Sequence, residues 1–103
     1  MLTAVQAKQA VIELVRANRK MFIGSPDPDM LAALPLEDRG SGEFAFGAFV
    51  VYPNQRLYKA DIGFGAPEVY SYLGSFERKD DKWIASEPEV SRFHEPLNDN
   101  PRE

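Results

Sequence analysis

The spacing of apolar residues changes once along this chain of 103 residues. Over the first 23 residues they recur at helical spacing, and from Glu43 onward they alternate with polar residues and are rich in Phe, Tyr and Val. A period near 3.6 is typical of an amphipathic helix, and a period of two is typical of a strand. The chain is therefore predicted to be an α+β protein, with a long N-terminal helix packed on a curved antiparallel meander of four to five strands.

The predicted first helix covers residues 4–22. Thr3 and Gln6 form a capping-box pattern at its start, and Gly24 stands where a glycine commonly ends a helix. On this helix Asn18 falls in the centre of the apolar arc. A buried amide needs hydrogen-bond partners, so Asn18 is expected either to bond to a nearby backbone group or to line a pocket between helix and sheet.

A second, shorter helix is predicted after the loop that follows. Asp27 suits an N-cap and Pro28 suits the first helical position. The helix is expected to stop at Pro35 and to cover an apolar flank of the first helix. Residues 36–42 are polar and contain glycine, and they are expected to form a loop.

Four strands are predicted, over residues 43–52, 57–64, 68–78 and 83–87, with an extension over 90–94. Turns at Asn54–Gln55 and at Asp80–Asp81 connect two hairpins. Glycines inside strands predict bends, or places where a large ring lies across the sheet. A small SH3-like barrel with an external helix is the alternative architecture. The layout also resembles cystatin-like and NTF2-like architectures, a likeness that implies no function.

Size and composition limit the possible functions. One domain over residues 1–94 and a disordered tail over 95–103 are expected. The chain has no cysteine, no apolar run of membrane-spanning length and a net charge of −4. Residues 1–23 carry four basic and one acidic side chain, and the remainder is acidic. We therefore expect a small soluble cytoplasmic protein that binds neither nucleic acid nor membranes.

No catalytic or metal-binding pattern stands out. His94 is the only histidine and lies beside Glu95, which could orient it as a general base requires. It sits next to the expected tail, where a cleft is uncommon. The acidic pairs lack the ligand spacing of a calcium loop, and no glycine-rich phosphate loop is present. No enzymatic activity, cofactor or metal is predicted.

Aromatic side chains dominate the remaining candidates. The second face of the sheet is predicted to expose aromatic surface, which usually marks an interface; the candidates on the sheet are Phe44, Phe46, Tyr52, Tyr70 and Tyr72. A non-enzymatic interaction domain that forms a homodimer is the first hypothesis. A small-ligand domain with a pocket near Asn18 and His94 is the second. An acidic inhibitor or immunity-type protein that masks a basic partner is the third.

Overall fold

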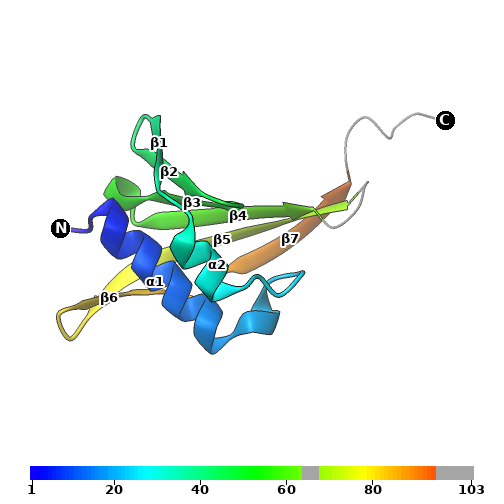
Figure 1. Cartoon of the computed structure of the whole chain (residues 1–103), viewed down its shortest axis with the longest axis horizontal. Coiled ribbons are helices and arrows are strands. Elements are labelled where there is room, and N and C mark those ends of the chain that lie inside the picture. Colours follow the sequence, from blue (N-terminus) through cyan, green and yellow to red (C-terminus); the bar gives the residue numbers. More distant parts are fainter. Residues whose placement is uncertain (64–67, 95–103) are drawn as a thin grey trace.

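A computed structural model describes residues 1–63 and 68–94 of the chain. Two α-helices lie on one face of an antiparallel sheet (Figure 1). The helical elements are α1 (Ala4–Ala17), η1 (Arg19–Met21), α2 (Pro28–Ala33) and η2 (Pro53–Gln55). The strands are β1 (Glu37–Gly40), β2 (Glu43–Phe46), β3 (Phe49–Tyr52), β4 (Leu57–Gly63), β5 (Glu68–Lys79), β6 (Lys82–Ala85) and β7 (Glu89–His94). The α+β prediction is confirmed.

Helix α1 begins as predicted and ends earlier than predicted. The Thr3 hydroxyl accepts from the Gln6 backbone N–H, and the Gln6 side chain accepts from the Thr3 N–H, so the capping box is complete. The predicted end at residue 22 is wrong, because α1 stops at Ala17 and the 3₁₀ turn η1 follows. This break lets Phe22 take an extended conformation and reach the core, where its ring lies 5.2 Å from that of Phe49.

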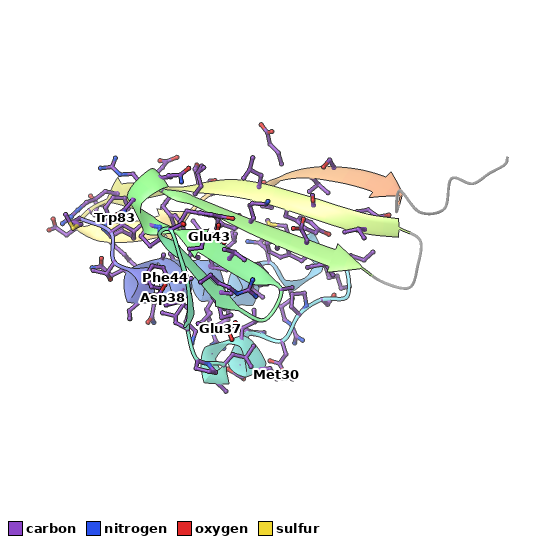
Figure 2. All side chains as sticks on the ribbon, turned by 90° about the horizontal axis from the view of Figure 1, so that it is seen from above. Met30, Glu37, Asp38, Glu43, Phe44 and Trp83 are labelled. Atoms are coloured by element: carbon purple, nitrogen blue, oxygen red, sulfur yellow. The ribbon has the colours of Figure 1, made fainter. Side chains whose placement is uncertain are left out.

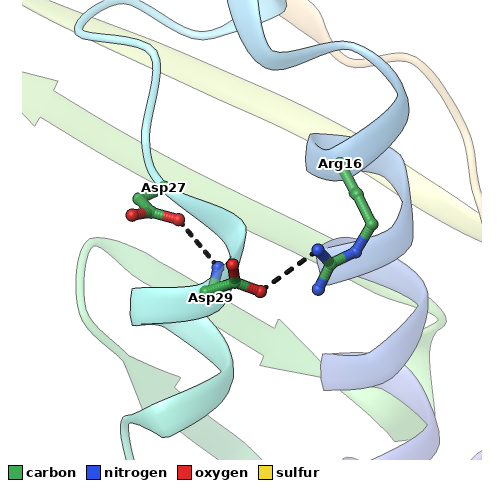
Figure 3. A network of polar contacts seen from close by, with 3 residues as sticks. All are labelled: Arg16, Asp27 and Asp29. Atoms are coloured by element: carbon green, nitrogen blue, oxygen red, sulfur yellow. Dashed lines mark hydrogen bonds and ion pairs between the residues drawn. The ribbon is translucent and has the colours of Figure 1, made fainter.

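Helix α2 packs against α1, as the sequence predicted. Asp27 caps it by accepting from the Asp29 N–H, and the Asp29 carboxylate lies 3.1 Å from the Arg16 guanidinium of α1 (Figure 3). Lys8 of α1 donates to the backbone carbonyls of Ala32 and Leu34 at the other end of α2. One flank of α1 is therefore covered by α2, and the flank on its other side faces β6.

The sheet is open. Its order is β1-β2-β3-β4-β5, and β6 and β7 both pair with β5 on its far side. Within the described residues no pairing joins β1 to β6 or β7, so the SH3-like barrel alternative is wrong. The ends of β4, β5 and β7 extend past the helices as a three-stranded ribbon (Figure 1).

The first hairpins differ from the prediction. The predicted strand over residues 43–52 is wrong, because Gly47 and Ala48 form a turn that separates β2 from β3. Gly47 has φ +63°, which suits the first central position of a type II′ turn. The loop predicted over residues 36–42 is also wrong, because β1 pairs there with β2.

Because of the turn at Gly47, Phe44 and Phe46 lie on the face of the sheet opposite to the predicted one. Phe46 pairs with Phe49, and Phe44 pairs with Val51. Paired residues in an antiparallel sheet point to the same face, so Phe44 and Phe46 lie on the helix-facing side. The first predicted turn, at Asn54 and Gln55, has the register that a tip at these two residues implies, with Val51 paired with Tyr58.

A bulge separates β6 from β7. Phe76 pairs with Ala85 and Leu73 pairs with Glu89, so the β6–β7 side holds one more residue between these pairs than β5 does. The Tyr58 hydroxyl crosses β5 and donates to the Ser86 carbonyl at 2.5 Å. Burial raises the pKa of Tyr58 above its usual value, and the Glu87 carboxylate raises it further.

Gly74 gives the Tyr58 ring its space. A Cβ at Gly74 would lie 2.2 Å from Cε1 of Tyr58, so no larger residue fits without movement of the ring or the strand. The sequence-based expectation that a strand glycine lets a ring lie across the sheet is confirmed at this position. The ring is completely buried, and its hydroxyl bonds to the Ser86 carbonyl of the bulge from inside the core.

Candidate functional site

The structure distributes the predicted site residues differently from the prediction. Asn18 is exposed at the C-cap of α1 rather than buried in the apolar arc, because the helix ends one residue before it. Its backbone N–H, not its side chain, bonds to the carbonyls of Leu14 and Val15. The expectation that Asn18 lines a helix–sheet pocket is therefore wrong.

The aromatic candidates do not share an exposed face. Phe46 and Tyr72 are buried in the core, and Phe44 and Tyr70 are half-buried against it on the helix-facing side. The Tyr72 hydroxyl accepts from the Ile23 N–H at 2.8 Å, which holds the segment after η1 on the sheet. Tyr52 alone of these five lies on the outer face, where it is half-buried.

His94 ends β7 opposite Glu68 of β5. The side chain of His94 lies outside the described part of the structure, as do Glu95 and the predicted tail. The histidine and Asn18 belong to elements separated in the fold, one at the end of the ribbon and one at the end of α1.

The outer face near β7 is mostly polar. One row across β4, β5 and β7 consists of Lys59, Leu73 and Glu89, and the next consists of Asp61, Ser71 and Ser91. The Ser71 hydroxyl donates to the Asp61 carboxylate within the second row. Leu73 is the exception, since it is a large apolar residue with 48% of its surface exposed.

Two edge strands of the sheet, β1 and β7, differ in length, regularity and charge. β1 has four residues, all exposed, three of them charged, and its register shifts between Asp38 and Gly40. β7 has six residues in unbroken register with β5, and its Val90 is 52% exposed. Within the described residues, β7 has no strand on its other side. A hollow of about 370 Å³ runs along this strand beside Leu73 and Val90.

A second hollow, of about 210 Å³, lies between the N-terminal half of α1 and β6. Its lining combines apolar, amide and charged side chains: Val5, Gln6, Gln9, Ala10, Glu13, Asp81, Lys82 and Trp83. Figure 2 places Trp83 at one end of the sheet, far from the free end of the ribbon. The guanidinium groups of Arg56 and Arg78 lie 5.4 and 5.9 Å from the centre of its ring.

The sequence analysis placed Trp83 only at the start of the predicted strand over residues 83–87 and not in a candidate site. Its indole Nε1 is buried, and no hydrogen-bond acceptor reaches it from the described residues. The signal that could have marked this residue is the single tryptophan placed directly after a charged turn, since an indole needs an acceptor when it is buried.

Outside these two hollows, the described residues offer few groups that could bind a ligand or carry out a reaction. The described residues hold no group of three or more His, Cys, Asp or Glu side chains able to hold a metal ion. Among the helices of that part of the chain, none has the length and apolar character needed to cross a bilayer. Searches of family models, of curated proteins and of solved structures find no match to this chain.

Proposed function

We propose that this protein is a non-enzymatic interaction domain that forms a homodimer through the exposed edge of β7. The observation that carries the proposal is the regular, open edge of this six-residue strand. An edge strand presents unpaired backbone N–H and C=O groups, which a second strand can satisfy. Two copies related by a two-fold axis would pair their β7 strands antiparallel and continue the sheet.

The side chains around the edge support this arrangement. Val90 and Leu73 lie on opposite faces of the sheet, and both are about half exposed. Pairing of two β7 strands would bring the Val90 side chains of both copies onto the same face of the continued sheet, whereas Leu73 lies one strand further in, on β5. Apolar surface removed from water stabilises association by roughly 25 cal/mol per Å².

The expected dimer is weak. A single strand pair whose exposed apolar contribution is Val90 from each copy covers much less than the roughly 1,600 Å² of a typical stable interface. Association must also offset the loss of translational and rotational freedom. We therefore expect a dissociation constant on the order of micromolar or weaker. The cytoplasmic location stays a prediction from composition.

Sedimentation of the full chain between about 1 and 100 µM tests the proposal. The wild type is expected to shift from monomer to dimer over this range. Val90→Lys is expected to stay monomeric, because lysine on an edge strand opposes pairing and two copies would bring like charges together. Met30→Lys is the matched control, since Met30 is also an exposed apolar residue but lies on α2.

The control is expected to dimerise like the wild type. A wild-type chain that remains monomeric over the whole range would remove self-association as its function. A Val90→Lys variant that dimerises as well as the wild type would move the interface away from β7.

A further inference from the structure

The backbone groups of β5 face β4 and the β6–β7 side in alternation. The Phe76 N–H donates to the carbonyl of Arg56, directly before β4, at 2.9 Å. The carbonyl of the neighbouring Ser75 instead accepts from the Ser86 N–H, directly after β6, at 2.8 Å. The register of β5 with both β4 and β7 is unbroken, so the alternation continues along the strand. The even-numbered residues of β5 therefore bond to β4, and the odd-numbered residues bond to β7.

This alternation shows which backbone groups of β7 lie at the free edge. The odd-numbered residues of β5 pair with the odd-numbered residues of β7, whose N–H and C=O groups therefore point into the sheet. The N–H groups of the other three residues of the strand point away from β5; these residues are Val90, Arg92 and His94. The edge of β7 thus presents three backbone donors at alternate positions.

Pro88 limits this edge at its start. Proline has no N–H, so no donor occupies the edge position before Val90. The Pro88 carbonyl shares a peptide plane with the Glu89 N–H, which points into the sheet, so this carbonyl points outward. By the same rule the carbonyls of Val90 and Arg92 also point outward. The edge therefore combines donors at residues 90, 92 and 94 with acceptors at residues 88, 90 and 92.

These donors and acceptors match those of a second, two-fold related copy. With the axis at Ser91, the N–H groups of residues 90, 92 and 94 face the carbonyls of residues 92, 90 and 88 of the second copy. Within residues 88–94, one other antiparallel register satisfies all three donors, and it places the axis at Arg92. That register sets two arginines directly opposite each other, and like charges in this position destabilise a strand pair. The axis at Ser91 sets two serines opposite each other instead.

We propose that two copies of this chain pair through β7 with Ser91 on the two-fold axis. The inference rests on the proposed homodimer and adds the residues that meet in it. On the outer face, the row of Asp61, Ser71 and Ser91 continues into the same row of the second copy. Ser91 is exposed in the single chain, so its hydroxyl is free to meet that of the second copy. Serine pairs across strands can form hydrogen bonds.

Single cysteine variants of the full chain test this register, because the chain has no cysteine of its own. Across the axis the Ser91 pair would have Cα atoms about 4.5 Å apart, a distance that a disulfide spans. Two copies of Arg92 would be offset by two residues along the strands, and their Cα atoms would lie more than about 7 Å apart. Ser91→Cys is therefore expected to form a disulfide-linked dimer at least about tenfold faster than Arg92→Cys. Ser41→Cys, in the exposed turn between β1 and β2, measures cross-linking by chance collision.

Non-reducing gels measure the cross-linking rates, and each rate is divided by that of the same variant with a small disulfide to remove differences in thiol reactivity. Sedimentation of the reduced variants measures association separately. Association with fastest cross-linking through Arg92→Cys would overturn the register and leave the homodimer in place. Association with equal rates for Ser91→Cys and Ser41→Cys would also overturn the register. Variants and wild type that all stay monomeric would overturn the homodimer and the register together.

Discussion

Two of the edge strands of the sheet, β1 and β7, are opposite in kind. β1 is short, charged and interrupted by a bulge, so a further strand finds few regular backbone groups to pair with. β7 is longer and in unbroken register, and its exposed valine adds apolar surface. The sheet is therefore protected against further strand pairing at β1 and open to it at β7.

The two edges are also supported differently from within. The β6–β7 edge is anchored through β5 by the buried Tyr58 ring, which crosses Gly74 and bonds to Ser86. The β1 edge rests on β2 and ends at Gly40, whose φ is +82° and around which a Cβ would meet nothing within 4 Å. Substitutions at the two edges should therefore have unequal costs.

The largest expected effect is that of Gly74→Ala. The added Cβ would lie 2.2 Å from the ring of Tyr58, and neither the buried ring nor the central strand can move freely. We expect a loss of about 3 kcal/mol in the free energy of unfolding, the upper part of the usual cost of overpacking. Urea denaturation measures this loss.

Gly40→Ala is the matched control on the opposite edge. It has space for the Cβ and only its positive φ opposes the substitution, so a cost of about 1 kcal/mol is expected. If the two variants lose equal stability, the Tyr58 ring does not hold the β6–β7 edge in the way described.

Tyr58→Phe has the next largest effect. It removes the donor to the Ser86 carbonyl, in the half-buried bulge, and keeps the ring over Gly74. At neutral pH we expect a loss of about 1–1.5 kcal/mol in unfolding free energy. Tyr52→Phe, at a half-buried tyrosine of the outer face, is the control and is expected to cost less.

The same variant changes the response to alkaline pH. Because the folded-state pKa of Tyr58 is raised, the native state keeps its proton where the unfolded chain has lost it. The unfolded state then binds fewer protons, so wild-type stability falls as pH rises above about 10. Tyr58→Phe should lose less stability over that range in denaturation at pH 9 and 11. Parallel losses in both proteins would contradict the assignment.

The smallest expected effect on stability comes from replacing the charges of β1 with threonine, in Glu37→Thr, Asp38→Thr and Arg39→Thr together. All three side chains are exposed, and their one ion pair spans 3.3 Å at the surface, so the change should stay within about 0.5 kcal/mol. Association should nevertheless increase, because a second edge becomes able to pair. Sedimentation should then show species larger than the wild type forms; an unchanged mass would mean that the bulge alone protects β1.

Local chemistry made much of this fold predictable. The capping box at Thr3, the Asp27 cap and the turn at Asn54 each depend on residues within a few positions of one another. Their interactions form in nearly any context, so sequence alone places them. The alternation of apolar residues from Glu43 onward also predicted that strands follow the helices.

The faces of Phe44 and Phe46 were not predictable from alternation. In a continuous strand, Phe44 and Phe46 would point to the other face of the sheet from Phe49 and Val51. With a two-residue turn at Gly47 they pair with these residues and point to the same face. Both arrangements satisfy the period of two along each segment. Four aromatic candidates pack in or against the core, two buried and two half-buried, which removes the proposed exposed aromatic face. This placement follows largely from core packing that sequence could not supply.

The change of hydrophobic period near residue 43 determined the class of this protein and the order of its elements, because each period suits one backbone geometry. Tertiary structure decided where α1 ends, since the core position of Phe22 against Phe49 and Tyr72 outweighs continued helix. It also decided which edge of the sheet is open and which indole is left without an acceptor. Those features depend on contacts between residues distant in the chain, and local patterns do not encode them.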